Sequence, residues 1–596
     1  MPECASLIDT ANSKNCLVVF CSVVELNFSP VGEEGNYGKV CVGAVPLKTF
    51  EAIVIGSGAT GGVAAQTLAE AGVRVLVLEA GPDFSPQEAL GREPLNSMRR
   101  VRGLLSGQHR QQVQHPGYWK HNPLLYADER QYPYSTPKNE PFLWTQGRQV
   151  GGRSLTWGGI TLRLSDLEFK AAERDGHGCS WPISHEDLDP HYTALERQFA
   201  IHGNRDGLVQ LPDGCTTAPL RFTPEEEHFS HVLKNVTEIE MIHSRGFSSH
   251  RPSPECPWPP SSSPASSLKR AIATGRVEIL AGHLAERLLM NSDQSRARGV
   301  IVIDQRNGER IELEAPLVVL CASTIASLRF LLLSENSRTD RGFHDPSASL
   351  GHHLMDHVST CRFFKVPSLS GRQSLQDLDP SSQLSGAGSF FLPFGSCPPP
   401  RKGLLPFLRG YGLWGAINRF DPPWWLKRNP DFRLGFLIGH GEMLPSDQNR
   451  VTLSGTVDRW GVPIPHISCR WGANEAAMVD HMKVMMREAI SYASGQMQPL
   501  TDLVKMPFFE PVVRNMEAMK EGAPPPGYYV HEVGGAPMGD DEDSSVVDPW
   551  NRLWRCPNVL VVDGSCWPTS AWQSPTLTMM AITRRACLQA VRPENA

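Results

Sequence analysis

The stretch at residues 50–81, FEAIVIGSGATGGVAAQTLAEAGVRVLVLEAG, constrains the fold of this chain more than any other. A short apolar run at Ala52–Ile55 leads into the pattern G-x-G-x-x-G, which is followed by helical spacing at 63–71 and a second apolar run at 73–78. This order predicts a strand, a tight turn, a helix and a second strand, the unit that opens a parallel α/β sheet.

The glycines of this unit suit a bound dinucleotide. Gly56 permits the sharp turn, Gly58 lets the backbone approach a pyrophosphate, and Gly61 lets the helix pack closely on the strand. Glu79 ends the second apolar run, where a carboxylate accepts hydrogen bonds from a ribose. We expect dinucleotide binding, and the acid favours FAD or NAD over NADP because it suits an unphosphorylated ribose.

Length and composition point to a multidomain globular protein. The chain has 596 residues, too many for one core, so we expect two or more domains. A formal net charge of -6 gives no reason to expect a nucleic acid or a membrane surface as a partner. The 14 cysteines show no C-x-x-C or zinc spacing, which favours a reducing, intracellular compartment.

Residues 1–48 precede the dinucleotide unit and are interpreted as an extension of unknown role. Their apolar run at 16–24 is too short to span a bilayer and has no basic region before it, so we expect neither a membrane segment nor a signal peptide.

Several later stretches give local expectations. The polar stretch at 82–141 has the length of loops that are functional or that cover another part of the protein. Ser184, with Asp187 three residues later, predicts the start of a helix. Residues 204–267 are polar and proline-rich, typical of a linker or surface excursion, and 366–430 suit lids or surface insertions. Asn307-Gly308 predicts a hairpin, the apolar run before Ala322 a strand feeding a helix, and 474–493 a further helix.

Two further stretches bear on function, one rich in glycine and one rich in histidine. Residues 147–159, GRQVGGRSLTWGG, suit a backbone that passes close to a flat ligand, because glycines remove side chains there. His352, His353, Asp356 and His357 invite a metal site, but no further ligand set is evident and the spacing is not that of zinc enzymes. We expect no metal.

The C-terminal region carries the candidate chemistry. His531 precedes a second glycine patch, a buried strand at 559–562 leads to a turn at Asp563-Gly564, and Ser574-Pro575 opens a helix at 576–590. Serine at the N-cap with proline at the first helical position is a favourable start, and the helix N-terminus would direct a positive dipole end at whatever lies before it.

Taken together, these motifs resemble the glucose-methanol-choline family of FAD-dependent oxidoreductases. The resemblance covers residues 50–590 and rests on GSGATGG with Glu79, GRQVGGRSLTWGG, LGHHLMDH, NRVTL with DRWGVP, HEVGGAPMG, and VVDGS with SPTLTMMA. The branch containing pyranose 2-oxidase and the gluconate dehydrogenase flavoprotein subunit is the most similar, because WPIS and GRQVGGRS are of its type.

The resemblance implies a mixed α/β fold, a Rossmann-type FAD-binding domain with an inserted substrate domain built on an antiparallel sheet. The FAD-binding domain would comprise 49–170, 270–357 and 528–596, and the substrate domain 171–269 and 358–527. The implied cofactor-binding residues are Gly56, Gly58, Ala59, Thr60, Gly61, Glu79, Gly151, Gly152, Ser154, Thr156, Trp157, Gly158, Asp563, Gly564, Pro575 and Thr576.

The resemblance also implies a catalytic histidine at His531, with a second catalytic position at Ser574, where the family has histidine or asparagine. Serine reaches less far, so Ser574 either holds the substrate hydroxyl or only caps its helix, and Gln573 is a possible stand-in. Pyranose 2-oxidase carries a flavin-linked histidine at the position of Thr156. Threonine cannot form that link, so we expect non-covalent FAD.

The implied reaction is oxidation of an alcohol or sugar-like hydroxyl, in which His531 accepts the hydroxyl proton while hydride passes to flavin N5. The electron acceptor, whether oxygen, a quinone or a redox partner, leaves no motif. Two alternatives stay open: an FAD-dependent isomerase, lyase or cyclase without net oxidation, and a flavin-binding protein that has lost turnover.

Overall fold

The structure is a computed structural model of the chain. It describes residues 50–592 apart from 237–239, 249–252, 336–341, 370–385, 393–404, 420–425, 428, 430, 506–509, 511–512, 515–516 and 518–520. The extension at 1–48 lies outside the described residues, as do parts of the expected insertion at 366–430. Residues from Leu47 onward form one compact unit.

One six-stranded sheet is built around the dinucleotide unit, with the order β16-β17-β8-β1-β2-β4. All pairings among β17, β8, β1, β2 and β4 are parallel, and only the edge strand β16 runs antiparallel. The strands are β1 (Ala52–Ile55), β2 (Val75–Glu79), β4 (Val277–Ala281), β8 (Leu317–Leu320), β16 (Arg552–Leu553) and β17 (Cys556–Val561).

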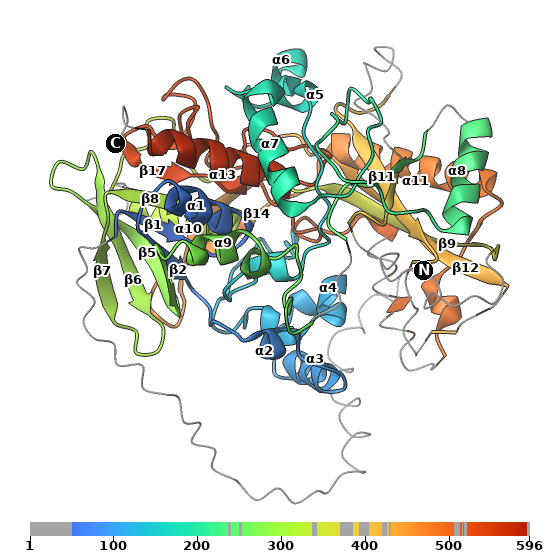
Figure 1. Cartoon of the computed structure of the whole chain (residues 1–596), viewed down its shortest axis with the longest axis horizontal. Helices are drawn as coiled ribbons and strands as arrows, with labels where there is room; N and C mark the ends of the chain where they lie inside the picture. The colour runs from blue at the N-terminus through green and yellow to red at the C-terminus, as the bar shows by residue number, and fades with distance from the viewer. Residues whose placement is uncertain are drawn as a thin grey trace, which may run out of the picture. The chain divides into compact units, whose positions relative to one another are not determined.

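The two faces of this sheet carry alternate residues of each strand. In β1, Ala52 and Val54 join a cluster with α1, α9 and α13, whereas Ile53 and Ile55 join the larger core. Both faces are buried, which explains why these strands read as continuous apolar runs. Figure 1 shows the helices beside the sheet: α1 (Ala59–Glu70), α9 (Ser267–Ala273), α10 (Thr324–Ser334) and α13 (Thr576–Ala590).

A second six-stranded sheet, ordered β15-β9-β12-β11-β10-β3, is antiparallel throughout. Helix α11 (Ala473–Tyr492) packs on β9 and β12, and α8 (Pro224–Val236) packs on α11 and β11. This sheet lies on the opposite side of the view in Figure 1 from β1 and β2. Its strands are β3 (Ile242–His243), β9 (Val358–Pro367), β10 (Phe390–Leu392), β11 (Tyr411–Ile417), β12 (Phe432–Gly441) and β15 (Gln496–Met497).

Smaller elements complete the described fold. The Asn307-Gly308 hairpin is confirmed, because β6 pairs antiparallel with β7 on either side of it. Ser184 forms the expected capping box with Asp187. The elements are β5 (His283–Met290), β6 (Ala297–Asp304), β7 (Arg310–Glu314), β13 (Arg450–Val457), β14 (Pro463–Ser468), α2 (Pro86–Leu90), α3 (Leu95–Leu105), α4 (Pro116–Lys120), α5 (Asp166–Phe169), α6 (Ala171–Asp175) and α7 (His185–Phe199).

The mixed α/β fold class is confirmed, but two local interpretations were wrong. Residues 204–267 are more than a linker, because α8 buries Phe229 and Leu233 and β3 extends the antiparallel sheet. Within 366–430, β10 and β11 are central strands rather than surface insertion. The helix opened by Gly61 also begins earlier than its apolar spacing indicated, at Ala59. Among the described helices, none has the length and apolar character that crossing a membrane requires.

Candidate active site

A cavity of about 500 Å³ lies where the two sheets approach each other, lined from both. The segments that line it are the turn after β1, the end of β2, the glycine patch, the start of α10 and the C-terminal segment. Of the site residues predicted from the sequence, those that line it are Gly56, Gly58, Ala59, Thr60, Glu79, Gly152, Ser154, Thr156, Trp157, Gly158, His531, Asp563, Gly564, Ser574, Pro575 and Thr576.

The two remaining predicted residues, Gly61 and Gly151, serve the backbone rather than the cavity wall. A Cβ on Gly61 would lie 1.9 Å from the carbonyl oxygen of Gly56, so only glycine allows α1 to pack against the turn. Gly151 has a φ of 96°, and its N–H donates to Ser57 Oγ at 3.0 Å. It therefore fastens the glycine patch to the first turn.

The wall around the first turn has the features that a dinucleotide requires. A Cβ on Gly58 or Gly158 would meet nothing within 4 Å, so backbone faces open space at both. No side chain caps the N-terminus of α1, whose first-turn N–H groups are therefore free for an anion. These residues fit a flat cofactor with a pyrophosphate.

Glu79 ends β2 with its carboxylate held by hydrogen bonds. It accepts from Ser57 Oγ at 2.5 Å, from the Ser57 N–H at 3.3 Å and from the Gly81 N–H at 2.9 Å. Burial raises its pKa, and these donors oppose that shift. The carboxylate is thus fixed at the place where the sequence predicts a ribose contact.

The C-terminal segment delivers Asp563 and the start of α13 to the same cavity. Asp563 accepts from Ser327 Oγ and, at 3.0 Å, from the Ser565 N–H. The expected cap at Ser574 is wrong: α13 begins at Thr576, Pro575 takes the N-cap position, and no side chain caps the helix. Ser574 stands one residue too early for its hydroxyl to reach the first-turn N–H groups.

Gln573 does not line the cavity. Its Nε2 donates to the carbonyl oxygen of Gln210 at 3.1 Å, so its amide is directed away from the site. Ser574 lines the cavity, so its role as the second catalytic position stays a prediction, whereas the contact of the Gln573 amide with Gln210 does not favour Gln573 in that role.

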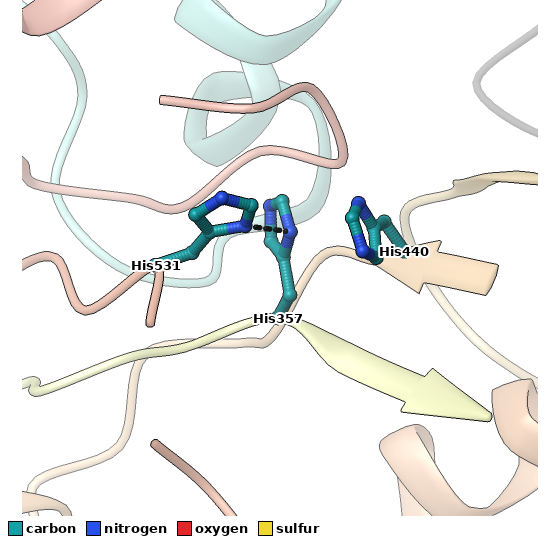
Figure 2. A group of neighbouring side chains, drawn as sticks. All are labelled: His357, His440 and His531. Atoms are coloured by element: carbon teal, nitrogen blue, oxygen red, sulfur yellow. Dashed lines mark hydrogen bonds between the residues drawn. The ribbon is translucent and has the colours of Figure 1, made fainter. Parts of the chain in front are cut away.

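Three histidines from distant segments gather at one end of the cavity. Figure 2 shows His357 at the start of β9, His440 on β12 and His531 on a loop. One ring nitrogen from each lies within 4.8 Å of the others. His531 Nδ1 is 2.8 Å from His357 Nδ1, and His357 Nε2 is 2.7 Å from the carbonyl oxygen of Ala571.

These contacts define which nitrogens carry protons. Burial lowers the pKa of His357 to about 4 and, with His357 nearby, lowers the pKa of His531 well below its ordinary value, so both rings are neutral. A carbonyl oxygen only accepts, so His357 Nε2 is protonated and its Nδ1 is a lone pair. His531 Nδ1 must therefore donate, which leaves His531 Nε2 unprotonated.

Asp356 positions the backbone that carries His531. Its carboxylate accepts from the His531 N–H at 3.1 Å and from the Gly527 N–H at 2.6 Å. Burial raises the pKa of Asp356 to about 7. Asp356 thus holds the main chain of His531, and the adjacent His357 holds its ring.

His440 completes the cluster from the antiparallel sheet. Trp414 Nε1 donates to His440 Nε2 at 3.2 Å. His440 is 3% exposed, and within the described part of the chain its buried Nδ1 has no hydrogen-bond partner. Burial lowers its pKa well below the ordinary value, so the ring is neutral and Nδ1 carries the proton.

The other members of the histidine-rich motif lie elsewhere. His353 Nε2 pairs with Asp447 Oδ1 at 2.6 Å, and neither His352 nor His353 lines the cavity. The cluster of His357, His440 and His531 has the composition of a metal site, which the sequence did not predict. Its two closest nitrogens, however, share a proton in a hydrogen bond, an arrangement suited to acid–base chemistry.

Sequence reasoning missed several residues that line the cavity. His440 and Trp414 lie in strands without a motif, and His115, Lys120 and His121 come from the loop expected to cover something. The length of that loop was the one signal available for these last residues. Arg148, whose guanidinium lies 4.2 Å from the Tyr132 ring centre, was hidden within the glycine patch.

A parallel sheet with a cavity at its glycine turn is the architecture of a dinucleotide-binding domain. The sequence profiles for GMC oxidoreductase match residues 50–359 with the N-terminal part and 445–583 with the C-terminal part. The chain belongs to the GMC oxidoreductase family, and its members' cofactor, FAD, fits the donors and glycine-lined walls described above.

Curated relatives extend over nearly the whole chain. The 2-methyl-1,2-propanediol dehydrogenase of Mycolicibacterium austroafricanum is 24% identical, over 90% of this chain and 94% of its own. The gluconate 2-dehydrogenase flavoprotein of Pantoea cypripedii is 22% identical, over 90% and 92%. The second relative is of the branch that the sequence motifs resemble.

A solved structure supports the fold. Pyridoxine 4-oxidase from Mesorbium loti superposes with a TM-score of 0.58 and 16% identity, covering 91% of this chain and 99% of that protein. At this identity the likeness concerns the fold, which is the FAD-binding α/β fold expected from the sequence.

Proposed function

We propose that this protein oxidises an alcohol or sugar-like hydroxyl with His531 as the general base. The observation that carries the proposal is the proton order of the imidazole pair, in which Ala571 O and His357 leave His531 Nε2 as a lone pair at the cavity. Proton removal from a substrate hydroxyl requires such an acceptor at neutral pH.

FAD supplies the hydride acceptor when bound. We assign its pyrophosphate to the turn at Gly56–Thr60 and the N-terminus of α1, its ribose to Glu79, and its remaining contacts to the glycine patch and to Asp563 and Gly564. The segments 49–170, 270–357 and 528–596 would form the FAD-binding domain, and 171–269 with 358–527 the substrate domain. Thr156 replaces a linking histidine, so the cofactor is held without a covalent bond.

The protein's own groups would then divide the work. His531 Nε2 takes the hydroxyl proton, and His357 keeps the His531 ring in the required tautomer. Asp356 fixes the backbone at His531. The N-terminus of α13, whose residues Pro575 and Thr576 line the cavity, places a partial positive charge where negative charge develops on reduction.

The names of the relatives suggest a first panel of substrates: 2-methyl-1,2-propanediol and gluconate, one neutral and one anionic. Their shared feature is a secondary or primary hydroxyl on a small polar molecule. Anaerobic bleaching of the flavin by one of them supports oxidation, whereas a product of unchanged mass with oxidised flavin supports an isomerase or cyclase.

The direct test is His531→Ala. FAD should remain bound and anaerobic flavin reduction should slow by about a hundredfold to ten-thousandfold, because general-base catalysis is worth that much. His231→Ala is the matched control, since His231 is an exposed histidine of α8 outside the cavity. An unchanged rate in His531→Ala would remove His531 from the mechanism, and denaturation that releases no free flavin would contradict the non-covalent assignment.

A further inference from the structure

We propose that the outer face of α3 docks the protein onto a membrane surface that contains anionic lipid. The face consists of the apolar side chains of Met98, Val101 and Leu105 together with nearby arginines. This inference goes beyond the proposed function, because it concerns where the protein binds and not which bond it breaks. The chain has a formal net charge of -6, so an anionic partner requires a local excess of positive charge.

The helix α3 has its apolar side turned outward. Met98, Val101 and Leu105 are spaced i, i+3, i+7 and therefore share one face of the helix. They are 67%, 54% and 73% exposed. The residues that α3 buries are Asn96, Arg100 and Gly103. A helix whose only role is to cover a core has the reverse arrangement, with its apolar stripe inward and its polar residues in water.

Positive charge accompanies this apolar stripe. Arg99 and Arg102 belong to α3, and Arg102 lies one helical turn from both Met98 and Leu105. Glu93 is the single acid between residues 92 and 110, and it pairs with the buried Arg100 at 2.7 Å. The arginines that form no ion pair with any residue that the structure describes are Arg92, Arg99 and Arg102. Their charges are therefore available to lipid phosphates.

The elements beside α3 add apolar surface. Trp119 of α4 and Leu124 of the short helix η2 (Pro123–Leu125) are each 39% exposed, and η2 contacts α3. Within α3, Leu95 and Leu104 are 42% and 46% exposed. Exposed apolar groups gathered in this way mark interaction sites, and tryptophan is enriched where proteins meet the membrane interface.

The helix α3 is also joined to a wall of the cavity. Arg100 donates from Nε to the carbonyl oxygen of Tyr118 at 3.3 Å and from Nη2 to that of His121 at 3.0 Å. Gly117, Lys120 and His121 line the cavity. Figure 1 shows α3 together with α2 and α4, apart from both sheets. Docking through α3 would hold this part of the cavity wall close to the lipid.

A lipid surface fits this face better than a protein does. A second copy docked by the same face would bring its own Arg92, Arg99 and Arg102 against these, and like charges repel. An acidic protein would need a groove that matches the helix, whereas a fluid bilayer adapts to protruding side chains. Arginine stems can lie along the apolar stripe while their guanidinium groups reach the lipid headgroups.

The test is co-sedimentation of the FAD-loaded protein with vesicles. An equal mixture of phosphatidylcholine and phosphatidylglycerol should bind the protein at least about tenfold more tightly than phosphatidylcholine alone. Met98→Gln combined with Leu105→Gln should weaken binding to the mixed vesicles by about tenfold or more, and so should Arg99→Gln combined with Arg102→Gln. All four side chains lie on the surface of α3, so both double variants should keep FAD and the wild-type melting temperature.

A matched control substitutes the same residue types elsewhere. Arg205 and Val209 are exposed, Val209 by 66%, and neither belongs to α3 or to an element that contacts it. Arg205→Gln combined with Val209→Gln should bind the mixed vesicles as the wild type does. Between about 0.1 M and about 1 M salt the screening length falls from about 10 Å to about 3 Å, so the wild type should lose more affinity over this range than the double arginine variant.

Three results would overturn the proposal: no binding of the wild type to the mixed vesicles, equal binding to neutral and mixed vesicles, or equal binding of the wild type and both double variants of α3. If the wild type ignores vesicles but forms a dimer that Met98→Gln with Leu105→Gln abolishes, the face belongs to a second copy and the proposal is wrong. Flavin reduction by a dissolved alcohol should be the same in every variant, because none of the substituted residues lines the cavity. Failure of docking is therefore distinguishable from failure of the proposed function.

Discussion

The nucleotide turn and the histidine cluster differ in how the chain assembles them. Ser57 and Glu79 are 22 residues apart, and only α1 and β2 lie between them. His531 and His357 are separated by 174 residues, and their contact requires the two sheets to pack correctly. The first site is a local structure within one sheet, and the second depends on the tertiary fold as a whole.

The two regions also tolerate change differently. The turn is held by close backbone packing, because a Cβ added at Gly61 would collide with the carbonyl oxygen of Gly56. The cluster is held by side-chain hydrogen bonds that substitution can remove while the main chain stays in place. Damage to the turn should therefore cost the folded, FAD-loaded protein, whereas damage to the cluster should cost rate.

Gly61→Ala should have the largest effect. Its Cβ would lie 1.9 Å from the Gly56 carbonyl oxygen, so α1 must move away from the turn. We expect a loss of about 3 kcal/mol or more in the free energy of unfolding and loss of bound FAD, seen by thermal unfolding and flavin absorbance. Gly455→Ala is the control, because its Cβ would meet nothing within 4 Å. Equal melting temperatures would break the comparison.

His357→Phe should have the next largest effect, on rate alone. Without an acceptor at Nδ1, the His531 ring is free to place its proton on Nε2, the wrong tautomer for a base. Flavin reduction should slow by about tenfold to a hundredfold while FAD content stays unchanged. His357→Asn, whose amide oxygen can accept from His531 Nδ1, should recover part of the rate. Identical rates for the two variants would show that the role of His357 is packing only.

The sequence was most informative where function depends on local geometry. The roles of Gly56, Gly61 and Glu79 follow from one contiguous motif, and His531 was predicted because it precedes a glycine patch and matches the family pattern. His440 carried no signal, since a histidine near the end of an apolar strand has the same appearance whether it is buried structurally or lines a cavity. Its neighbours become visible only once β11 and β12 pair.

At Ser574 the prediction failed for a different reason. The rule that serine caps a helix was applied one residue before the position at which the helix is capped. Ser-Pro commonly opens a helix with serine as the cap, but Pro575 takes the N-cap position here, with helical φ and ψ of −77° and −16°.

The helix α8 was missed because charged residues and flanking prolines dominate its composition. Its burial of Phe229 and Leu233 four residues apart was a weak pattern before the sheet was known.

Glu79→Gln should have a moderate effect that sharpens the contrast. The carboxylate accepts from Ser57 and Gly81 with both oxygens, and an amide can keep only one of them. We expect FAD affinity to fall about tenfold, measured by flavin release on dilution, because a hydrogen bond to a charged group is worth about 1.5–3 kcal/mol. The reduction rate of the FAD-saturated variant should equal that of the wild type. A slower rate with full FAD occupancy would mean that the two regions are coupled.

The smallest expected effect is a lack of pH dependence near neutrality. The pKa of His357 is about 4, and that of His531 is also lowered by burial, so the imidazole pair keeps its proton order from about pH 8 to about pH 5. In Asp356→Asn, which removes the carboxyl whose pKa burial raises to about 7, flavin reduction at saturating alcohol should therefore be constant over this range. Below pH 5, protonation of His357 removes the acceptor for His531 Nδ1 and the rate should fall. An apparent pKa near 6.5 would instead indicate a solvated base.

The pH dependence of the protein's stability tests the protonation of the same histidines. A histidine that is buried neutral has a lower pKa folded than unfolded, so the unfolded chain binds more protons between pH 6.5 and about 4. The stability contributed by neutral His357 is therefore fully present above pH 6.5 and is lost as pH falls toward 4. His357→Phe should show a smaller decrease in melting temperature across this interval than the wild type. An equal decrease would place the acid sensitivity in other groups and leave the neutral imidazole pair, on which the assignment of His531 as base depends, without support.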